Sequence, residues 1–233
     1  MLYINYMRIF LIRHGESAQN TRENFDNLPD PQIPLTKKGI IQAENCAEFL
    51  KDYCHENKID LENSVMFISP YIRTRQTAKI INEKLNIKKV REDVSLIEHQ
   101  HGLFENQNED WEVDAPQEYE FVTNYRNNNG KFYVKFPQGE SPFDVALRTR
   151  IFIHTLFRDV AEGIENFFIV SHGTTIRCLL LSYFHYSPEW FNNEENMKNC
   201  SIRLIEKKGR KSYDRDYIYG GRIEKSNNSF PST

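Results

Sequence analysis

The 233-residue sequence lacks several features that mark out common classes of protein. Its 30 lysines and arginines nearly balance 33 aspartates and glutamates, so a net charge of −3 creates no strong attraction to nucleic acid or anionic lipid. No apolar run approaches the length that spans a membrane, and residues 1–8 lack the basic and apolar regions of a signal peptide. We therefore expect a soluble, cytoplasmic protein that binds neither nucleic acid nor membranes.

Cysteine is also scarce, and its four positions do not have the spacing of a metal site. Cys46 and Cys54 fall within one predicted helix, and neither Cys178 nor Cys200 has a CxxC partner. We expect all four to be reduced residues of core type in an intracellular protein.

Short apolar runs alternate with amphipathic segments along the chain. Residues 9–12, 65–68 and 167–170 each contain four consecutive apolar side chains, which is typical of buried strands. Further strands are predicted at 88–94, 201–205 and 217–219, and helices from Thr36 as N-cap, at 73–85, at 143–160 and at 174–184. This alternation predicts an α/β protein, a three-layer α/β/α sandwich around a mostly parallel sheet with the last two strands at its edge.

The sequence favours one domain with one unusual insertion. We predict a single domain over residues 1–221, a lid inserted at about 98–136, and a disordered tail over 222–233. The lid segment is rich in Asn, Glu and aromatic residues and is broken by Pro116 and Gly130. We expect it to be irregular, with short helical pieces.

Ionisable side chains follow three of the predicted strands. Arg13 and His14 follow the first strand, Arg73 comes one turn after the second, and His172 follows residues 167–170. Because the carboxyl ends of parallel strands meet at one edge of a sheet, these side chains can converge. Two arginines and two histidines can bind a phosphoryl dianion, and an imidazole can act as a covalent nucleophile. The pattern therefore predicts phosphoryl transfer, with Glu98 as the best-placed proton donor.

The motif Arg13-His14-Gly15-Glu16 resembles the signature of the histidine phosphatase superfamily, the phosphoglycerate-mutase-like enzymes. The resemblance spans about residues 7–205 and continues in the family's order through Asn20, residues 34–39, residues 69–78, Glu98 with Gly102, and residues 170–173. Several motifs in the correct order make this resemblance far more specific than an isolated Arg-His pair.

The resemblance implies a role for each matching residue. His14 would become transiently phosphorylated, and Glu98 would protonate the leaving group and then activate water. Arg13, Arg73 and His172 would complete the catalytic set, and substrate would be bound by Arg13, Asn20, Arg73, His172 and Thr174. The resemblance implies no metal and no cofactor, and a small phosphorylated substrate, with a phosphoprotein as a further possibility. It implies no particular oligomeric state.

Two observations point to phosphatases rather than glycolytic mutases. Residues 29–36 and 136–141 resemble the acid-phosphatase-like, broad-specificity branch of the family. From His99 to Tyr125 there is no lysine or arginine, although the family's mutases place basic residues there. The same window contains Glu105, Glu109, Asp110, Glu112, Asp114, Glu118 and Glu120. Carboxylates in a lid would repel a second anionic group, so we predict a phosphomonoesterase that disfavours polyanionic substrates.

Several alternatives remain open from the sequence. The protein could be a mutase that retains the phosphoryl group, or a non-catalytic module that binds phosphoproteins. Glu105 could replace Glu98 as the proton donor. Arg75 and Arg177 are expected at the surface or in helix packing. His99 and His101 are expected at the rim of the pocket or in solvent, because two ligands are too few to predict a metal site.

Overall fold

A computed structural model describes residues 6–21, 28–105 and 111–223. The strands of its six-stranded sheet are β1 (Tyr6–Arg13), β2 (Ser64–Ile68), β3 (Lys89–Glu92), β4 (Asn166–Ser171), β5 (Ile202–Lys208) and β6 (Lys211–Tyr219). The α-helices are α1 (Ala18–Thr21), α2 (Lys37–Glu56), α3 (Ile72–Leu85), α4 (Trp111–Asp114), α5 (Pro116–Asn129), α6 (Pro142–Ala161), α7 (Gly173–Phe184) and α8 (Pro188–Asn193). Single 3₁₀ turns form η1 (Asp30–Gln32), η2 (Val94–Leu96) and η3 (Gly102–Phe104).

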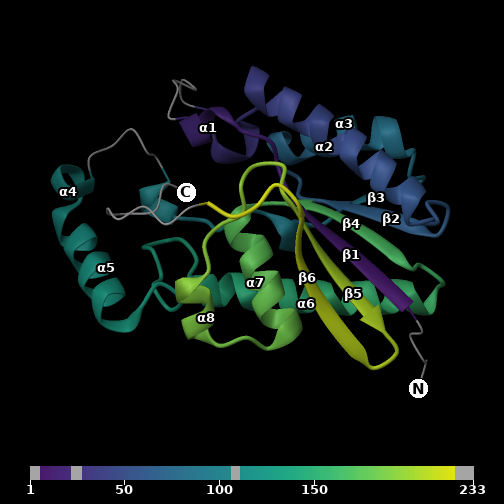
Figure 1. Cartoon of the computed structure of the whole chain (residues 1–233). Helices are drawn as coiled ribbons and strands as arrows, with labels where there is room; N and C mark the ends of the chain where they lie inside the picture. The colour runs from purple at the N-terminus through teal and green to yellow at the C-terminus, as the bar shows by residue number, and fades with distance from the viewer. Residues whose placement is uncertain (1–5, 22–27, 106–110, 224–233) are drawn as a thin grey trace.

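The sheet has the order β3-β2-β4-β1-β5-β6. β3, β2, β4 and β1 are parallel, whereas β5 and β6 form an antiparallel hairpin beside β1. Helices α2 and α3 cover one face of the sheet, and α6 and α7 cover the other (Figure 1). The predicted three-layer sandwich with a mostly parallel sheet is confirmed. β5 lies inside the sheet, because β6 and not β5 forms that edge.

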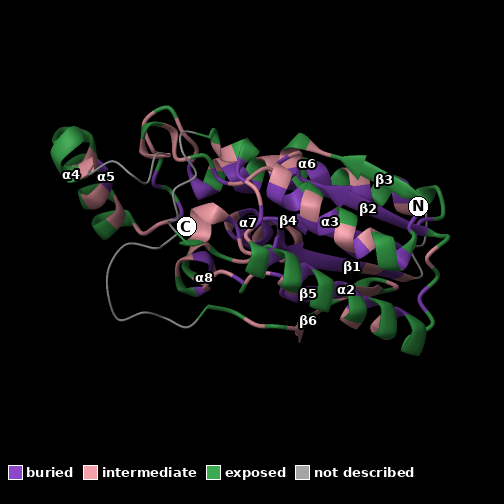
Figure 2. Ribbon diagram, turned by 90° about the horizontal axis from the view of Figure 1, so that it is seen from above, coloured by how far each residue is buried: buried purple, intermediate pink, exposed green. Residues whose placement is uncertain are grey.

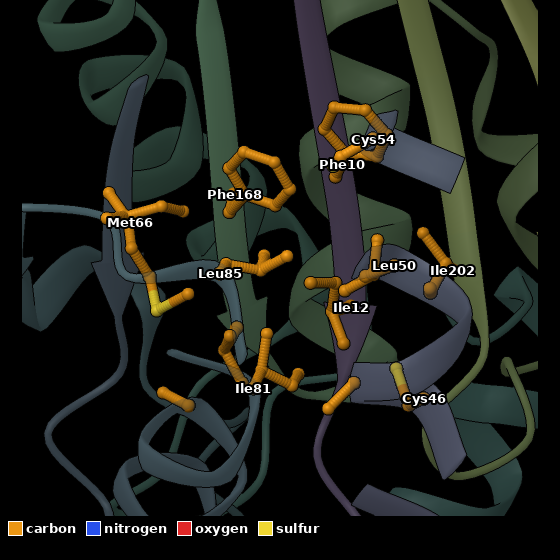
Figure 3. Close-up of a cluster of buried hydrophobic side chains, with 14 of the residues drawn as sticks. Phe10, Ile12, Cys46, Leu50, Cys54, Met66, Ile81, Leu85, Phe168 and Ile202 are labelled. Atoms are coloured by element: carbon orange, nitrogen blue, oxygen red, sulfur yellow. The ribbon is translucent and has the colours of Figure 1, made fainter. Parts of the chain in front are cut away.

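The central strands are apolar on both sides because helices cover both of their faces. Along β1, Phe10 and Ile12 enter the core under α2 and α3, while Ile9 and Leu11 enter the core under α6 and α7. Figure 3 shows the first of these cores, where the rings of Phe10 and Phe168 stack with their centroids 4.6 Å apart. Successive side chains of β1 therefore point to opposite faces of the sheet, and this one strand contributes to two separate hydrophobic cores.

Helix α2 begins where the sequence predicts it. Thr36 is the N-cap, and its hydroxyl oxygen accepts a hydrogen bond from the Gly39 amide at 3.0 Å. A Cβ atom at Gly39 would lie 2.0 Å from the Glu16 carbonyl oxygen, so only glycine allows this backbone approach. The contact holds the loop after β1 against the first turn of α2. The four cysteines are free and buried, as expected.

Helix α6 is predicted correctly, but most of the apolar residues that predict it lie on its exposed face. Its start is fixed by a capping box between Ser141 and Asp144. Phe143, Leu147 and Ile151, which supply most of the helical periodicity in the sequence, are 43%, 48% and 68% exposed. The buried apolar side chains are Val145, Ala146, Phe152, Ile153 and Leu156.

The inserted segment contains more regular structure than predicted. Helices α4 and α5 lie together at one end of the sheet, at the left of Figure 1, and α5 contains 14 residues. Most of their described surface is exposed (Figure 2), and Val122 is the buried residue of α5. Glu109 and Asp110 fall outside the described residues.

The C-terminal end of the described chain returns to the folded body. Arg222 pairs with Met197 in an isolated bridge, and the Ile223 amide donates to the Asn196 carbonyl at 2.7 Å. Residues 224–233, most of the predicted tail, lie outside the described residues. None of the described helices is long and apolar enough to cross a membrane.

Candidate active site

The register of the sheet brings the ends of three strands together. Arg13 is paired with Ser171 across β1 and β4, and Ile68 is paired with Val170 across β2 and β4. The His14 amide continues this pattern by donating to the Ser171 carbonyl at 3.0 Å. The residues that follow β1, β2 and β4 therefore lie at one edge of the sheet, as the sequence predicts.

His14 is buried, with 3% of its surface exposed, and its ring is held in one orientation. Its Nδ1 atom lies 2.7 Å from the Gly15 carbonyl oxygen. Since a carbonyl only accepts hydrogen bonds, Nδ1 carries the proton and Nε2 keeps its lone pair. Burial, and then the charges of Arg73 and Arg13, hold the pKa of His14 well below its ordinary value. The ring is thus neutral, and Nε2 is the nitrogen that has the free lone pair.

His172 lies beside His14, with ring centroids 5.1 Å apart. Its Nε2 atom is 2.9 Å from the Ser69 hydroxyl, while its Nδ1 atom is buried without a hydrogen-bond partner. Burial, followed by the Arg73 charge, also lowers the pKa of His172 well below its usual value. His172 is therefore neutral and offers one unused nitrogen at this edge.

Arg73 is 1% exposed, and its five N–H groups can be accounted for individually. Nη1 donates to the Asp30 carbonyl oxygen at 2.7 Å and to Asp30 Oδ1 at 2.9 Å, and Nη2 donates to Asp30 Oδ2 at 3.2 Å. Nε is buried without a partner. The Nε hydrogen and the second Nη2 hydrogen point along the same edge of the guanidinium. This edge forms a fork that fits two phosphoryl oxygens.

Arg13 has the same kind of unused donor. Its Nη1 donates to the Met197 carbonyl, but its buried Nε has no partner. Burial lowers the pKa of Arg13, the Glu98 carboxylate raises it, and Arg73 lowers it further. Together with Arg73 Nε and His172 Nδ1, this makes three buried nitrogens near His14 that have no hydrogen-bond partner among the described residues. Unpaired buried polar atoms are rare in folded proteins, and a cluster of them indicates a place for a polar ligand.

Asn20 and Asn199 hold the loop that carries His14. Asn20 Oδ1 accepts hydrogen bonds from the Ser17 amide and from Asn199 Nδ2, both at 3.1 Å. The Asn20 amide nitrogen is the group that its side chain can offer to a substrate. Asn199 Nδ2 also donates to the His14 carbonyl at 3.1 Å. Asn199 has no signal in the sequence, because its partners are almost the whole chain away.

Glu98 lies where its charge acts on both arginines. Its Oε1 accepts from the His99 amide at 2.9 Å and from the Thr175 hydroxyl at 3.4 Å. Burial raises the pKa of Glu98, and the His99 amide and the two arginines act in the opposite direction. A carboxyl group with a raised pKa retains a proton that it can donate. Thr174, partly exposed in the first turn of α7, adds a hydroxyl beside His172.

Glu105 is the other carboxyl group close to this set. Its Oε2 accepts from the His101 amide at 2.7 Å, and its side chain is 31% exposed. Burial, and then the charge of Asp30, raise the pKa of Glu105 to about 7. The remaining described carboxylates of the acidic segment are exposed on or beside α4 and α5; they are Glu112, Asp114, Glu118 and Glu120. Among the described acids of that segment, Glu105 is therefore the one whose charge could repel a second anionic group of the substrate.

The remaining expectations have mixed outcomes. Arg75 forms a surface ion pair with Glu92 at 2.7 Å, and Arg177 packs over the Phe191 ring, as predicted. His99 is 5% exposed and its Nε2 lies 2.7 Å from the Glu140 carbonyl, so it is neither at the rim nor in solvent. Within the described ranges, no group of three or more His, Cys, Asp or Glu side chains could hold a metal ion.

Comparison with known proteins gives this geometry its context. Residues 9–214 match the model of the histidine phosphatase superfamily (branch 1). The chain is 33% identical over 212 residues to the phosphoglycerate mutase-like protein AT74 of Arabidopsis thaliana, covering 85% of this chain and 64% of AT74, so it spans less than two thirds of that relative. It is 29% identical to the broad-range acid phosphatase DET1 of Saccharomyces cerevisiae, covering 85% of this chain and 84% of DET1.

The overall fold is shared with known structures. A crystal structure of a putative alpha-ribazole-5'-P phosphatase from Escherichia coli superposes with a TM-score of 0.73 at 19% identity, covering 94% of this chain and 99% of the other. The matched residues include the sheet edge that carries the buried imidazoles and guanidiniums described above. The chain belongs to the histidine phosphatase superfamily, branch 1.

Proposed function

We propose that the protein is a phosphomonoesterase that works through a phosphohistidine on Nε2 of His14 and uses no metal ion. The observation that carries this proposal is the hydrogen bond between His14 Nδ1 and the Gly15 carbonyl. It leaves the Nε2 lone pair free in a buried, neutral ring beside two arginines. Such a ring is an activated nucleophile next to a cationic site for the phosphoryl group.

The reaction has two in-line transfers. In the first, the His14 Nε2 lone pair forms a bond to phosphorus, the bond from phosphorus to the ester oxygen breaks, and Glu98 gives its proton to the leaving oxygen. In the second, the Glu98 carboxylate takes a proton from water, the water oxygen bonds to phosphorus, and the P–N bond returns its electrons to His14. Arg13, Arg73 and His172 bind the phosphoryl oxygens throughout, with the amide of Asn20 and the hydroxyl of Thr174 as further donors.

We propose that substrates with a second anionic group are disfavoured. Support comes from Asp30 and Glu105, which add negative charge near the Arg73 guanidinium. A mutase has the opposite need, because it must hold a substrate that carries a carboxylate as well as a phosphate. AT74 and other relatives are named mutase-like, so the comparison of hydrolysis with isomerisation belongs in the first experiment.

The test is to trap the intermediate. Radiolabelled substrate mixed with the enzyme and quenched in alkali is expected to leave acid-labile label on the His14 peptide. His14→Ala should show no label and should lower kcat roughly 10⁴-fold or more. Activity should survive a metal chelator, and released phosphate should exceed any isomer of phosphoglycerate. A His14→Ala enzyme with native activity, or activity abolished by the chelator, would contradict the proposal.

The proton donor can be assigned separately. Glu98→Gln should lower kcat on an alkyl phosphate roughly 100-fold or more, because its alkoxide leaving group needs a proton. The initial burst of nitrophenolate from p-nitrophenyl phosphate should be affected far less, because that leaving group is stable as an anion. If Glu105→Gln and not Glu98→Gln shows this dependence on the leaving group, Glu105 is the donor.

A further inference from the structure

Asp30 is an unexpected residue in a site for phosphate. It binds the same guanidinium that the proposed function assigns to the phosphoryl group, and its side chain is 9% exposed. A carboxylate in this position weakens the attraction of Arg73 for a dianion. A contact between this carboxylate and another part of the substrate would offset the resulting loss of phosphate affinity.

The N–H groups of Arg73 place Asp30 relative to that substrate. Asp30 occupies the Nη1/Nη2 edge, and the fork left over is the Nε/Nη2 edge. The two edges share Nη2, so a phosphoryl group and the Asp30 carboxylate would bind hydrogens of one nitrogen. The buried, unpartnered Nε is a sign of a ligand that is independent of the acidic residues.

The alcohol part of the substrate must extend toward Glu98, because Glu98 has to reach the ester oxygen. The negative charge of Asp30 opposes the ionisation of both Glu98 and Glu105, and Glu105 also feels Glu98. Asp30 and Glu105 are therefore close enough to Glu98 for their charges to act on the group that has to protonate the ester oxygen. Arg13 and Arg73 lie on the phosphoryl side. The two carboxylates thus add negative charge close to Glu98, and Asp30 does so while it is bound to Arg73.

We propose that Asp30 and Glu105 form a subsite for an ammonium group, so that the preferred substrates are phosphomonoesters of amino alcohols. This inference rests on the proposed function. The phosphate of such a substrate binds the free fork of Arg73, and its ammonium group donates hydrogen bonds to the two carboxylates. Asp30 then acts as a residue that determines specificity, in addition to being the partner of Arg73.

Three esters of similar size separate charge from shape. O-phosphoethanolamine carries an ammonium group, propyl phosphate carries a methyl group in the same position, and phosphoglycolate carries a carboxylate. The kcat/KM for O-phosphoethanolamine is expected to exceed that for propyl phosphate roughly tenfold or more, as for a hydrogen bond to a charged group. Phosphoglycolate is expected to be the poorest of the three.

Variants then assign the preference to its residues. Asp30→Asn and Glu105→Gln should each lower the ratio for O-phosphoethanolamine over propyl phosphate severalfold, toward equal use of the two esters. Glu112→Gln, on the exposed surface of α4, should leave that ratio unchanged. Because both esters are measured on the same preparation, a partly unfolded variant changes both rates and not their ratio.

Two failures can be told apart. Hydrolysis of p-nitrophenyl phosphate with labelled His14, but with no preference for the ammonium ester, overturns this inference alone. The inference also fails if the preference persists in both Asp30→Asn and Glu105→Gln. No hydrolysis of any ester and no label on His14 overturns the proposed function, and the inference with it.

Discussion

Arg203 and Arg73 are both buried but differ in how their hydrogen-bond donors are used. Arg203 is 7% exposed and sits in an ion cluster with Glu194 and Asp214, whose carboxylates take its Nη1, Nε and Nη2 donors. Burial lowers the pKa of Arg203, but Asp214 and Glu194 raise it more. Arg73 is 1% exposed, has one carboxylate partner, and keeps a buried Nε without any. Among the described residues, the two arginines thus differ in their hydrogen bonds: Arg203 uses its donors in the ion cluster, whereas Arg73 has a buried donor left for another group.

The largest effect expected from this comparison is on catalysis. Arg73→Met removes the phosphoryl fork and should lower kcat/KM roughly 10³-fold, within the range for loss of a cationic clamp on a phosphoryl group. The urea midpoint of unfolding should fall less than in Arg203→Met, because Arg73→Met leaves one carboxylate without its cation and Arg203→Met leaves two. Steady-state kinetics and urea unfolding of the same preparation test both parts. Native kcat/KM in this variant would show that Arg73 does not bind the phosphoryl group.

Arg203→Met should show the reverse pattern. It leaves Glu194 and Asp214 close together without their shared cation, at a cost of about 3 kcal/mol in the free energy of unfolding. For a chain of this size that cost lowers Tm by roughly 6–12 °C. Calorimetry and kinetics well below Tm provide the measurement. A large loss of kcat with Tm unchanged would show that the ion cluster also serves the active site.

Asn199→Ala should have a smaller effect, because the Asn199 side chain donates to the backbone carbonyl of His14 and not to its ring. It removes the hydrogen bonds to the His14 carbonyl and to Asn20 Oδ1. Loss of about 1.4 kcal/mol of positioning corresponds to roughly tenfold in kcat. KM should stay near its native value, and Asn199→Asp, which cannot donate, should be no better than alanine. A defect in KM alone would count against a positioning role.

The smallest expected effect is on the acid side of the pH profile. The lowered pKa of His14 keeps its ring neutral at pH values where an ordinary histidine becomes charged. Between pH 6.5 and 5, kcat/KM corrected for the ionisation of the substrate should therefore fall less than about twofold. A histidine of ordinary pKa would lose roughly 15-fold over that interval. A loss of that size would show that burial and the charges of Arg73 and Arg13 do not suppress the charge on His14.

The sequence predicts the parts of the fold that depend on local pattern. Runs of four apolar residues locate β1, β2 and β4, because strands buried on both faces need no polar alternation. The same local logic fails to identify the buried face of α6. Ile151 is 68% exposed although it has the spacing of a core residue, because α6 is apolar on both sides and only tertiary packing decides which side is buried.

The site shows the same division between local and long-range information. Arg13, His14 and His172 are found from the sequence because each directly follows an apolar strand, and the parallel register then brings them together. Asp30 and Asn199 are missed because their partners lie far away in the chain and no periodic pattern marks them. A residue that acts through an irregular loop can be found only when the loop's contacts are known.

The exposure of α4 and α5 has a consequence for how such a protein can change. Val122 is the buried residue of α5, and the described part of α4 buries none. The backbone around His14, by contrast, is held by Ser171, Asn199 and Cys200. Evolution can therefore exchange residues 111–129 with little loss of folding stability while the reacting atoms stay in place. The sequence of α4 and α5 can thus vary independently of the sheet edge that carries His14.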